Sequence, residues 1–235
     1  PTSLLAQVDS SVGGKVAVDL PQGKNLVGAF YHPRLVLIDP EVLNTLPKRY
    51  INDGMGEVIK YGCIREREFF ELLDRCGSRA GVMDYIEQVI CTCCDLKRQV
   101  VLQDERDTGL RMTLNFGHTI GHGIEAAVPY GTILHGEAVA LGMRAALFLS
   151  ERKAGLSSSD ANKILRTLQA LELPLALPNG IDTATVLQKT ASDKKFRAGS
   201  IRFVLLSKAG EAGISTNITR EDMAEAIEEL RRPLS

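Results

Sequence analysis

Three of the four histidines in this 235-residue chain lie between residues 118 and 135. His118 and His122 are four residues apart, which on a helix places their imidazoles about 40° apart around the axis and one turn from each other. His135 precedes a further helical pattern and can turn back toward the same space. Two imidazoles and a carboxylate form a frequent catalytic zinc site, with a fourth position open to water or substrate. Glu57, three residues before Lys60 on one helix face, is the candidate carboxylate.

The histidine spacing by itself leaves an ordinary helical pair as an alternative, because the Glu of an H-E-x-x-H motif is absent. Glycines at 117, 121 and 123 each weaken that helix by about 0.8–1.0 kcal/mol relative to Ala. This cost indicates that a ligand or another backbone approaches closely, and we interpret the segment as the floor of a pocket. Lys97 lies on the apolar stripe of its own helix, so it requires a partner or a ligand.

The periodicity of apolar residues predicts the elements that would position these side chains. Residues 1–40 read as α/β fragments, with glycine-rich loops around 10–15 and 23–25 and a strand at 35–38. From residue 50 the pattern is helical, with Asn52 or Asp53 as the first cap and Gly77 as the first stop. Helices are expected at about 52–76, 82–104, 114–127, 136–153, 159–171 and 183–192. Strands at 201–206 and 212–215 form a hairpin, and Thr219 with Asp222 opens a last helix.

Composition and charge exclude several classes of function. The chain has 28 basic and 29 acidic residues, a formal net charge of −1, and no long basic run, so we expect no nucleic-acid partner. No apolar stretch approaches the roughly 20 residues that span a bilayer, so we expect no membrane partner. Five cysteines, read as reduced thiols, fit a cytoplasmic protein, and we assign them no chemistry.

Motifs along the whole chain point to one enzyme family. They are PTSLLAQVDSSVGGK at 1–15, GKN at 23–25, GEVIK at 56–60, LNFGHT at 114–119 and HGE at 135–137. In this order and spacing they resemble the 3-dehydroquinate synthases. Ser3 stands where that family usually has Thr, a change that keeps the hydroxyl. The family's N-terminal dinucleotide-binding portion, with its glycine-rich pyrophosphate loop, is not in the sequence, so we expect a truncated chain.

The resemblance implies a fold and a reaction. The fold is an α/β remnant of a dinucleotide-binding domain at 1–49, followed by a mainly α-helical metal- and substrate-binding domain at 50–235. The reaction is that of a lyase of the shikimate pathway, which converts 3-deoxy-D-arabino-heptulosonate 7-phosphate to 3-dehydroquinate and phosphate. It proceeds by oxidation, β-elimination, reduction and intramolecular aldol closure, with NAD and Zn²⁺ or Co²⁺ as cofactors. The resemblance also implies a cytoplasmic homodimer that acts on a small sugar phosphate.

The resemblance further assigns roles to individual residues. The metal ligands would be Glu57, His118 and His135, with His122 contacting substrate instead. The positions that match NAD contacts are Thr2, Ser3, Lys15, Lys24, Val42, Leu43, Asn44 and Thr45. The positions that match substrate contacts are Asp9, Asn25, Lys60, Lys97, Arg111, Asn115 and one of Lys194 or Lys195.

Two other interpretations remain open. One is a different sugar-phosphate cyclase, which makes an inosose or valiolone skeleton with the same metal ligands. The other is a truncated module that folds and binds metal without turnover. Truncation would leave Leu4, Leu5, Val36 and Ile38 partly uncovered, so we expect residues 1–49 to be rearranged or covered by self-association.

Overall fold

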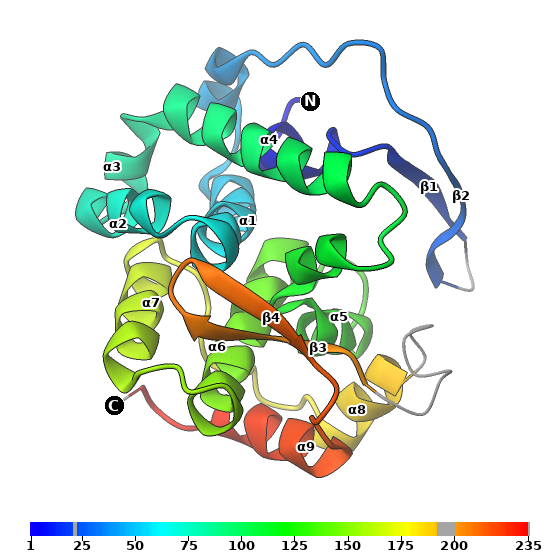
Figure 1. Cartoon of the computed structure of the whole chain (residues 1–235), viewed down its shortest axis with the longest axis vertical. Coiled ribbons are helices and arrows are strands. Elements are labelled where there is room, and N and C mark those ends of the chain that lie inside the picture. Colours follow the sequence, from blue (N-terminus) through cyan, green and yellow to red (C-terminus); the bar gives the residue numbers. More distant parts are fainter. Residues whose placement is uncertain (21–22, 192–200, 235) are drawn as a thin grey trace.

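The computed structural model describes residues 1–20, 23–191 and 201–234 (Figure 1). This part of the chain is mainly helical, as predicted for the segment after residue 50. The helices that carry the predicted metal and substrate residues are α1 (Lys48–Arg65), α4 (Ile86–Gln103), α5 (His118–Ala126) and α6 (His135–Lys153). The other helices are α2 (Arg67–Cys76), α3 (Arg79–Met83), α7 (Ser158–Ala170), α8 (Thr183–Ala191) and α9 (Arg220–Glu229). Short π or 3₁₀ turns lie at η1 (Ala6–Ser10), η2 (Pro40–Thr45) and η3 (Leu110–Asn115).

The first predicted helix, 52–76, is two helices. The backbone of Glu66 is extended, with φ −148°, and α2 then turns back against α1. Gly62 permits this close packing, because a Cβ at that position would lie 2.9 Å from the Cα of Phe70. The predicted stop at Gly77 is confirmed, since this residue ends α2 in a left-handed conformation with φ 63°. The predicted caps are wrong, because α1 starts earlier, at Lys48.

Helices α5 and α6 pack against each other at the centre of the molecule (Figure 1). Gly117 precedes α5 with φ +78°, and a Cβ there would meet Met143 and a carbonyl of α6. A Cβ on Gly121 would lie 2.7 Å from the carbonyl oxygen of Ala138. Gly123 meets α8 in the same way. The predicted pocket floor is therefore corrected: among the described residues these glycines serve backbone-to-backbone packing of helices, the other reason for close approach.

The first 40 residues differ most from the prediction. Strands β1 (Lys15–Leu20) and β2 (Gly23–Phe30) form an antiparallel hairpin, so the loop expected at 23–25 lies inside β2. The predicted strand at 35–38 is wrong: the segment is extended but unpaired, and Leu35 and Leu37 are each 80% exposed. A strand forms only where neighbouring backbone accepts its hydrogen bonds. Leu4, expected to be partly uncovered, is fully buried against Gly54.

The C-terminal elements follow the prediction closely. Strands β3 (Phe203–Lys208) and β4 (Glu211–Ser215) form the expected antiparallel hairpin, with Phe203 opposite Ser215. Thr219 and Asp222 make the predicted capping box at the start of α9. Within the described ranges, no helix is long and apolar enough to cross a membrane.

Candidate metal centre

One face of α1 presents the charged side chains of the candidate site. Glu57 is fully buried, and Lys60, three residues later, is 2% exposed and ion-paired with it. Burial alone would raise the pKa of Glu57, but the Lys60 ammonium and the imidazole of His118 hold it well below its ordinary value. Burial alone would likewise lower the pKa of Lys60, and Glu57 raises it. Both groups are therefore charged at neutral pH.

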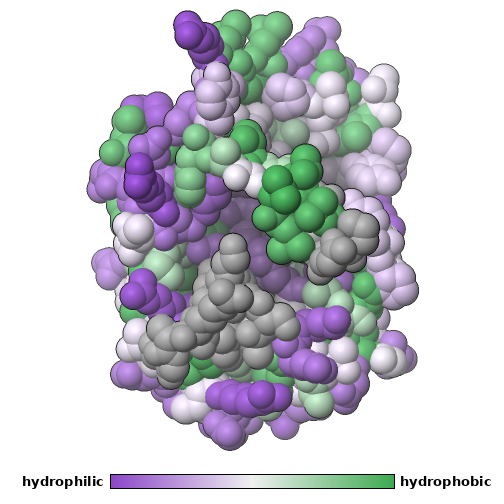
Figure 2. Space-filling model, turned by 90° about the vertical axis from the view of Figure 1, so that its right-hand side faces the viewer, coloured by the Kyte–Doolittle hydropathy of each residue, from purple (hydrophilic) through white to green (hydrophobic). Residues whose placement is uncertain are grey.

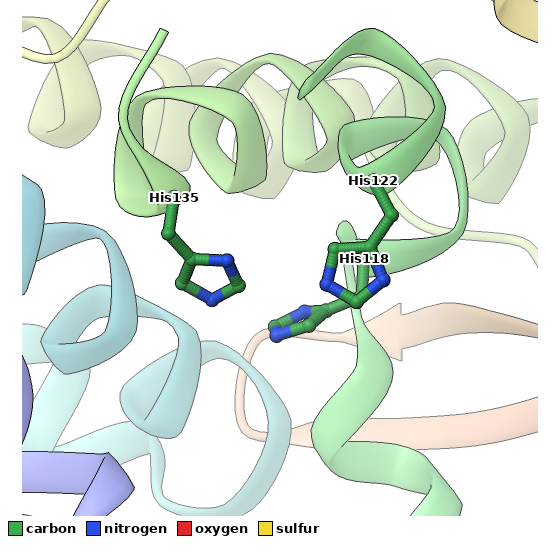
Figure 3. Close-up of side chains that lie close together, drawn as sticks. All are labelled: His118, His122 and His135. Atoms are coloured by element: carbon green, nitrogen blue, oxygen red, sulfur yellow. The ribbon is translucent and has the colours of Figure 1, made fainter. Parts of the chain in front are cut away.

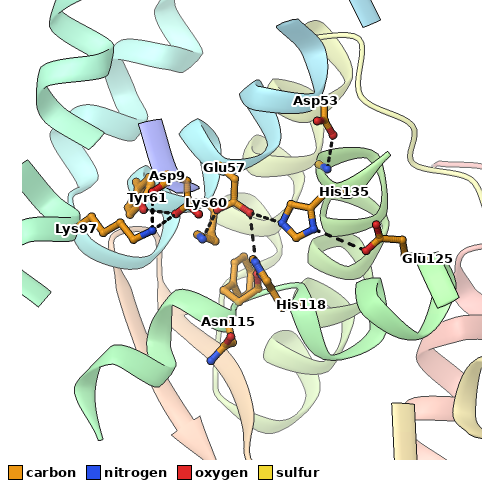
Figure 4. A network of polar contacts seen from close by, with 12 residues as sticks. Asp9, Asp53, Glu57, Lys60, Tyr61, Lys97, Asn115, His118, Glu125 and His135 are labelled. Atoms are coloured by element: carbon orange, nitrogen blue, oxygen red, sulfur yellow. Dashed lines mark hydrogen bonds and ion pairs between the residues drawn. The ribbon is translucent and has the colours of Figure 1, made fainter. Parts of the chain in front are cut away.

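His118 is the first residue of α5 and points at Glu57 (Figure 4). Its Nδ1 lies 3.1 Å from the carbonyl oxygen of Phe116, and its Nε2 lies 3.3 Å from Oε1 of Glu57. A carbonyl can only accept a hydrogen bond, so Nδ1 carries a proton, and Nε2 is the nitrogen through which the ring would bind a metal. Burial lowers the pKa of His118, with Lys60 adding to the effect, which favours the neutral ring that metals bind.

His135 is the first residue of α6 and approaches the same oxygen from the other side. Its Nε2 lies 3.2 Å from Oε1 of Glu57, and its Nδ1 lies 3.8 Å from Oε2 of Glu125. Burial alone would lower the pKa of His135, but Glu125 and Glu57 raise it to about 10. A metal at Nε2 would displace a proton from this ring.

Carboxylates hold the start of α6 in place. Asp53 accepts a hydrogen bond from the backbone N–H of Gly136 at 2.5 Å, so its oxygen serves α6 instead of the predicted cap of α1. Glu137 accepts from the backbone N–H of Leu134 at 2.8 Å and forms two hydrogen bonds with Arg49. These contacts fix the backbone on both sides of His135.

The three side chains fit a divalent metal. Zinc with ligand bonds of about 2.0–2.1 Å in a tetrahedron separates its ligand atoms by about 3.3–3.4 Å. The distances from Glu57 Oε1 to the two Nε2 atoms, 3.3 and 3.2 Å, match that edge. The ligand atoms of His118, His122 and His135 also all lie within 4.8 Å of one another (Figure 3). The structure therefore offers two overlapping donor sets that share His118 and His135.

A second polar cluster adjoins this site (Figure 4). Asp9, in η1, accepts hydrogen bonds on Oδ1 from the hydroxyl of Tyr61 at 2.6 Å and from Nζ of Lys97 at 3.0 Å. Lys97 also donates to the backbone oxygen of Asp9 at 2.8 Å. The lysine on the apolar stripe of α4 thus has the partner that the sequence required. Burial alone would raise the pKa of Asp9, but Lys97 lowers it, so Asp9 is ionised.

The remaining predicted substrate residues are placed unevenly. Asn115 ends η3 beside His118, and its amide donates to the carbonyl of Met112 at 3.1 Å (Figure 4). Arg111 is 3% exposed, and its guanidinium donates to the carbonyls of Glu105 and Gly13 at 2.6 and 2.7 Å. The side chain of Asn25 lies outside the described part of the chain, as do Lys194 and Lys195.

The predicted NAD residues make local contacts or lie exposed in the described part of the chain. Ser3 accepts from the backbone N–H of Ala6, and Thr45 donates to the carbonyl of Val42. Lys15 pairs with Asp107 at 2.5 Å. Three further positions are the exposed Thr2 and Asn44 and the buried Leu43, while the side chain of Lys24 is not described.

The surface beside the hairpin of β1 and β2 is hollowed, with hydrophilic residues at the floor of the hollow (Figure 2). The hairpin itself exposes large apolar side chains, among them Val18 at 58% and Val27 at 57%.

Sequence reasoning missed three contributors to the site. Glu125 carries a signal, since it follows His118 by seven residues on the same helix face. Tyr61 carries the weaker signal of following Glu57 by four, and the Phe116 carbonyl carries none.

Comparisons with known proteins identify the class of this fold. A valiolone synthase structure from Streptomyces hygroscopicus, solved with NAD⁺ and Zn²⁺ bound, matches with TM-score 0.88 and 25% identity over 98% of this chain and 64% of that one. A 2-deoxy-scyllo-inosose synthase, solved with carbaglucose-6-phosphate, NAD⁺ and Co²⁺, matches with TM-score 0.87 and 30% identity over 97% and 65%. The architecture is that of the sugar-phosphate cyclases.

The sequence narrows the class to one family. The C-terminal 3-dehydroquinate synthase model matches residues 54–196, and the N-terminal model matches residues 1–53. The chain belongs to the 3-dehydroquinate synthase family. The 3-dehydroquinate synthase of Clostridium botulinum is 51% identical over 93% of the chain, and that of Pelobacter propionicus is 48% identical over 95%. The chain spans 62% of the length of either relative.

Proposed function

We propose that this chain is the metal- and substrate-binding part of a 3-dehydroquinate synthase, a lyase that converts 3-deoxy-D-arabino-heptulosonate 7-phosphate to 3-dehydroquinate and phosphate. The observation that carries the proposal is the convergence of His118 Nε2 and His135 Nε2 on one oxygen of Glu57 at tetrahedral ligand spacing. Family membership and about 50% identity to named 3-dehydroquinate synthases support the same reaction.

Glu57, His118 and His135 would hold Zn²⁺ or Co²⁺, the metals found in the related cyclase structures. When bound, the metal would acidify substrate hydroxyls as a Lewis acid, and NAD would take up and return a hydride. Glu57 suits the ligand role better than His122, because Glu57 is anionic. Its Oε1 also lies 3.3 and 3.2 Å from the Nε2 atoms of His118 and His135, the separation expected between ligand atoms around tetrahedral zinc. His122, partly exposed beside them, would contact the substrate.

The charges of the site favour an anionic substrate. Glu57 and Asp9 are matched by Lys60 and Lys97, so these four charges cancel before a metal binds. With the Glu125 carboxylate beside His135 included, a divalent cation would leave an excess of one positive charge in a buried place, where the electrostatic attraction of a phosphate is strong. The Lys97 ammonium and the Asn115 amide would donate to the substrate, and the Asp9 carboxylate would accept from its hydroxyls.

NAD would be contacted by the exposed side chains of Thr2, Lys15 and Asn44, and by other predicted positions along residues 1–45. We propose residues 1–49 as the part that belongs to the cofactor domain and residues 50–235 as the metal and substrate domain. The cytoplasmic homodimer implied by the family resemblance is part of the same proposal.

Phosphate release tests the proposal and separates it from its alternatives. The chain, loaded with Co²⁺ and supplied with NAD, is incubated with the heptulosonate phosphate or with glucose 6-phosphate. Release from the heptulosonate supports dehydroquinate synthesis, and release from glucose 6-phosphate favours an inosose-type cyclase. Bound metal with release from neither substrate excludes both of these activities and leaves a valiolone-type cyclase or a metal-binding module without turnover.

A further inference from the structure

Glu125 has no role in the reaction described so far. It lies on α5 seven residues after His118, so one face of that helix presents His118, His122 and Glu125 in succession. Its side chain is 13% exposed, and Oε2 lies 3.8 Å from Nδ1 of His135. Figure 4 shows Glu125 on the opposite side of the His135 ring from Glu57.

The two imidazoles have similar surroundings, although the Nδ1 contact of His118 is a 3.1 Å hydrogen bond and that of His135 is a longer 3.8 Å ion-pair contact. In His118, Nδ1 faces the carbonyl oxygen of Phe116 and Nε2 faces Oε1 of Glu57. In His135, Nδ1 faces the carboxylate of Glu125 and Nε2 faces the same Oε1 of Glu57. Metal-binding histidines commonly donate their second ring N–H to a carboxylate or carbonyl, which fixes the tautomer and the orientation of the ring.

We propose that Glu125 is a positioning residue for the metal centre, holding the proton of His135 on Nδ1 so that Nε2 faces the metal. The imidazole of His135 lies between Glu125 and Glu57, so Glu125 would act on the metal through this ring. This role rests on the proposed metal site. It also links two ligands mechanically, since α5 carries both His118 and the group that orients His135.

A purely structural role predicts a different result. A carboxylate near the first residue of α6 also interacts favourably with the positive end of that helix, and its loss would then lower thermal stability alone. A role in orienting the His135 ring would instead change the affinity for metal, the geometry of the metal site and the protonation of the ring nitrogens.

The test compares Glu125→Gln, which keeps a neutral acceptor, with Glu125→Ala, which removes it. Glu151→Gln, on the exposed side of α6, is the matched control. Each 235-residue protein is titrated with Co²⁺ in competition with a chelator while the visible d–d bands are recorded. Ring ¹⁵N spectra of the metal-free proteins report the Nδ1 proton of His135.

We expect Glu125→Ala to bind Co²⁺ about 10–100-fold more weakly, with shifted bands, and Glu125→Gln to fall between it and the wild type. The Nδ1 proton signal of His135 is expected in the wild type and lost in Glu125→Ala. Unchanged affinity, bands and ring signals in Glu125→Ala would overturn the proposal, even if its melting temperature fell. If the wild type binds no Co²⁺, the proposed metal site is wrong. In that case the Nδ1 proton signal of His135 tests Glu125 separately, and an equal signal in the wild type and in Glu125→Ala refutes its role.

Discussion

Gly56 sets the distance between two proposed metal ligands, so Gly56→Ala is an informative perturbation. Gly56 precedes Glu57 on α1, and Gly136 follows His135 on α6. A Cβ on Gly56 would lie 2.8 Å from the carbonyl oxygen of Gly136 and 3.0 Å from its Cα. Both partners are backbone atoms, so neither can rotate away. Restoring van der Waals contact requires α1 and α6 to separate by about 0.5 Å.

This separation acts directly on the metal site. The 3.2 Å distance from Glu57 Oε1 to His135 Nε2 would open beyond the tetrahedral edge. Metal–ligand bonds are expected within about 0.2 Å of their ideal lengths, so the ligands would have to shift to restore them. We therefore expect zinc affinity to fall at least about tenfold. Stability should change less, because overpacking costs about 1–3 kcal/mol while Ala gains about 0.8–1.0 kcal/mol of helix propensity over Gly.

Chelator competition measures the zinc affinity, and thermal unfolding of the metal-free protein measures stability. Gly213→Ala is the control, because a Cβ there meets nothing within 4 Å. Wild-type zinc affinity in Gly56→Ala would refute the argument that packing of α1 on α6 sets the ligand geometry.

Three other perturbations follow from the structure. Lys97→Met leaves the Asp9 carboxylate without its cation and should cost about 1–3 kcal/mol, recovered in the double variant with Asp9→Asn and read from melting temperatures. Asp104 accepts hydrogen bonds from the backbone N–H groups of Thr108, Arg111 and Gly109, which lower its pKa from 3.8 to about 2. Its stabilisation of that loop should be complete above pH 3.8 and lost as pH falls through 2, a step in amide exchange that Asp104→Asn lacks. Arg144→Leu removes the donor to three backbone carbonyls and should cost about 3 kcal/mol, measured by urea unfolding.

The structure changes what is expected of the stability of Lys97→Met. The stripe position of Lys97 suggests that Met at this site would keep or raise stability, because the aliphatic volume is preserved. The ion pair with Asp9 reverses this expectation, because Lys97→Met leaves the Asp9 carboxylate without its cation and so lowers stability. Asp9 lies in η1, 88 residues away in sequence. Periodicity identified the position that needs a partner, and only tertiary structure could supply the partner.

Local signals predicted what depends on neighbouring residues. The spacing of His118 and His122, the capping box at Thr219 and the stop at Gly77 all lie within one or two turns of chain, and the structure has each of them. Asp53 shows the limit, because an acidic residue near a helix start predicts a cap, whereas its oxygen instead accepts from Gly136, 83 residues away.

The first 40 residues show a second limit. The segment 35–38 has a strand pattern, but a strand also requires a neighbour to pair with, and the described residues provide none. The sequence does not predict the hairpin of β1 and β2, because glycine and polar residues such as those at 23–25 are typical of loops. The sequence also gives no sign that the Phe116 carbonyl orients the His118 imidazole, since every residue has a carbonyl.

Metal stoichiometry after dialysis tests the central claim most directly, because it separates the two donor sets. The claim is that Glu57, His118 and His135 bind one divalent metal and that His122 does not. We expect one equivalent of zinc in the wild type and in His122→Ala, and little in His118→Ala and Glu57→Ala, with circular dichroism confirming that each protein is folded. Full zinc in folded Glu57→Ala together with its loss in His122→Ala would contradict the account and assign the site to the three histidines.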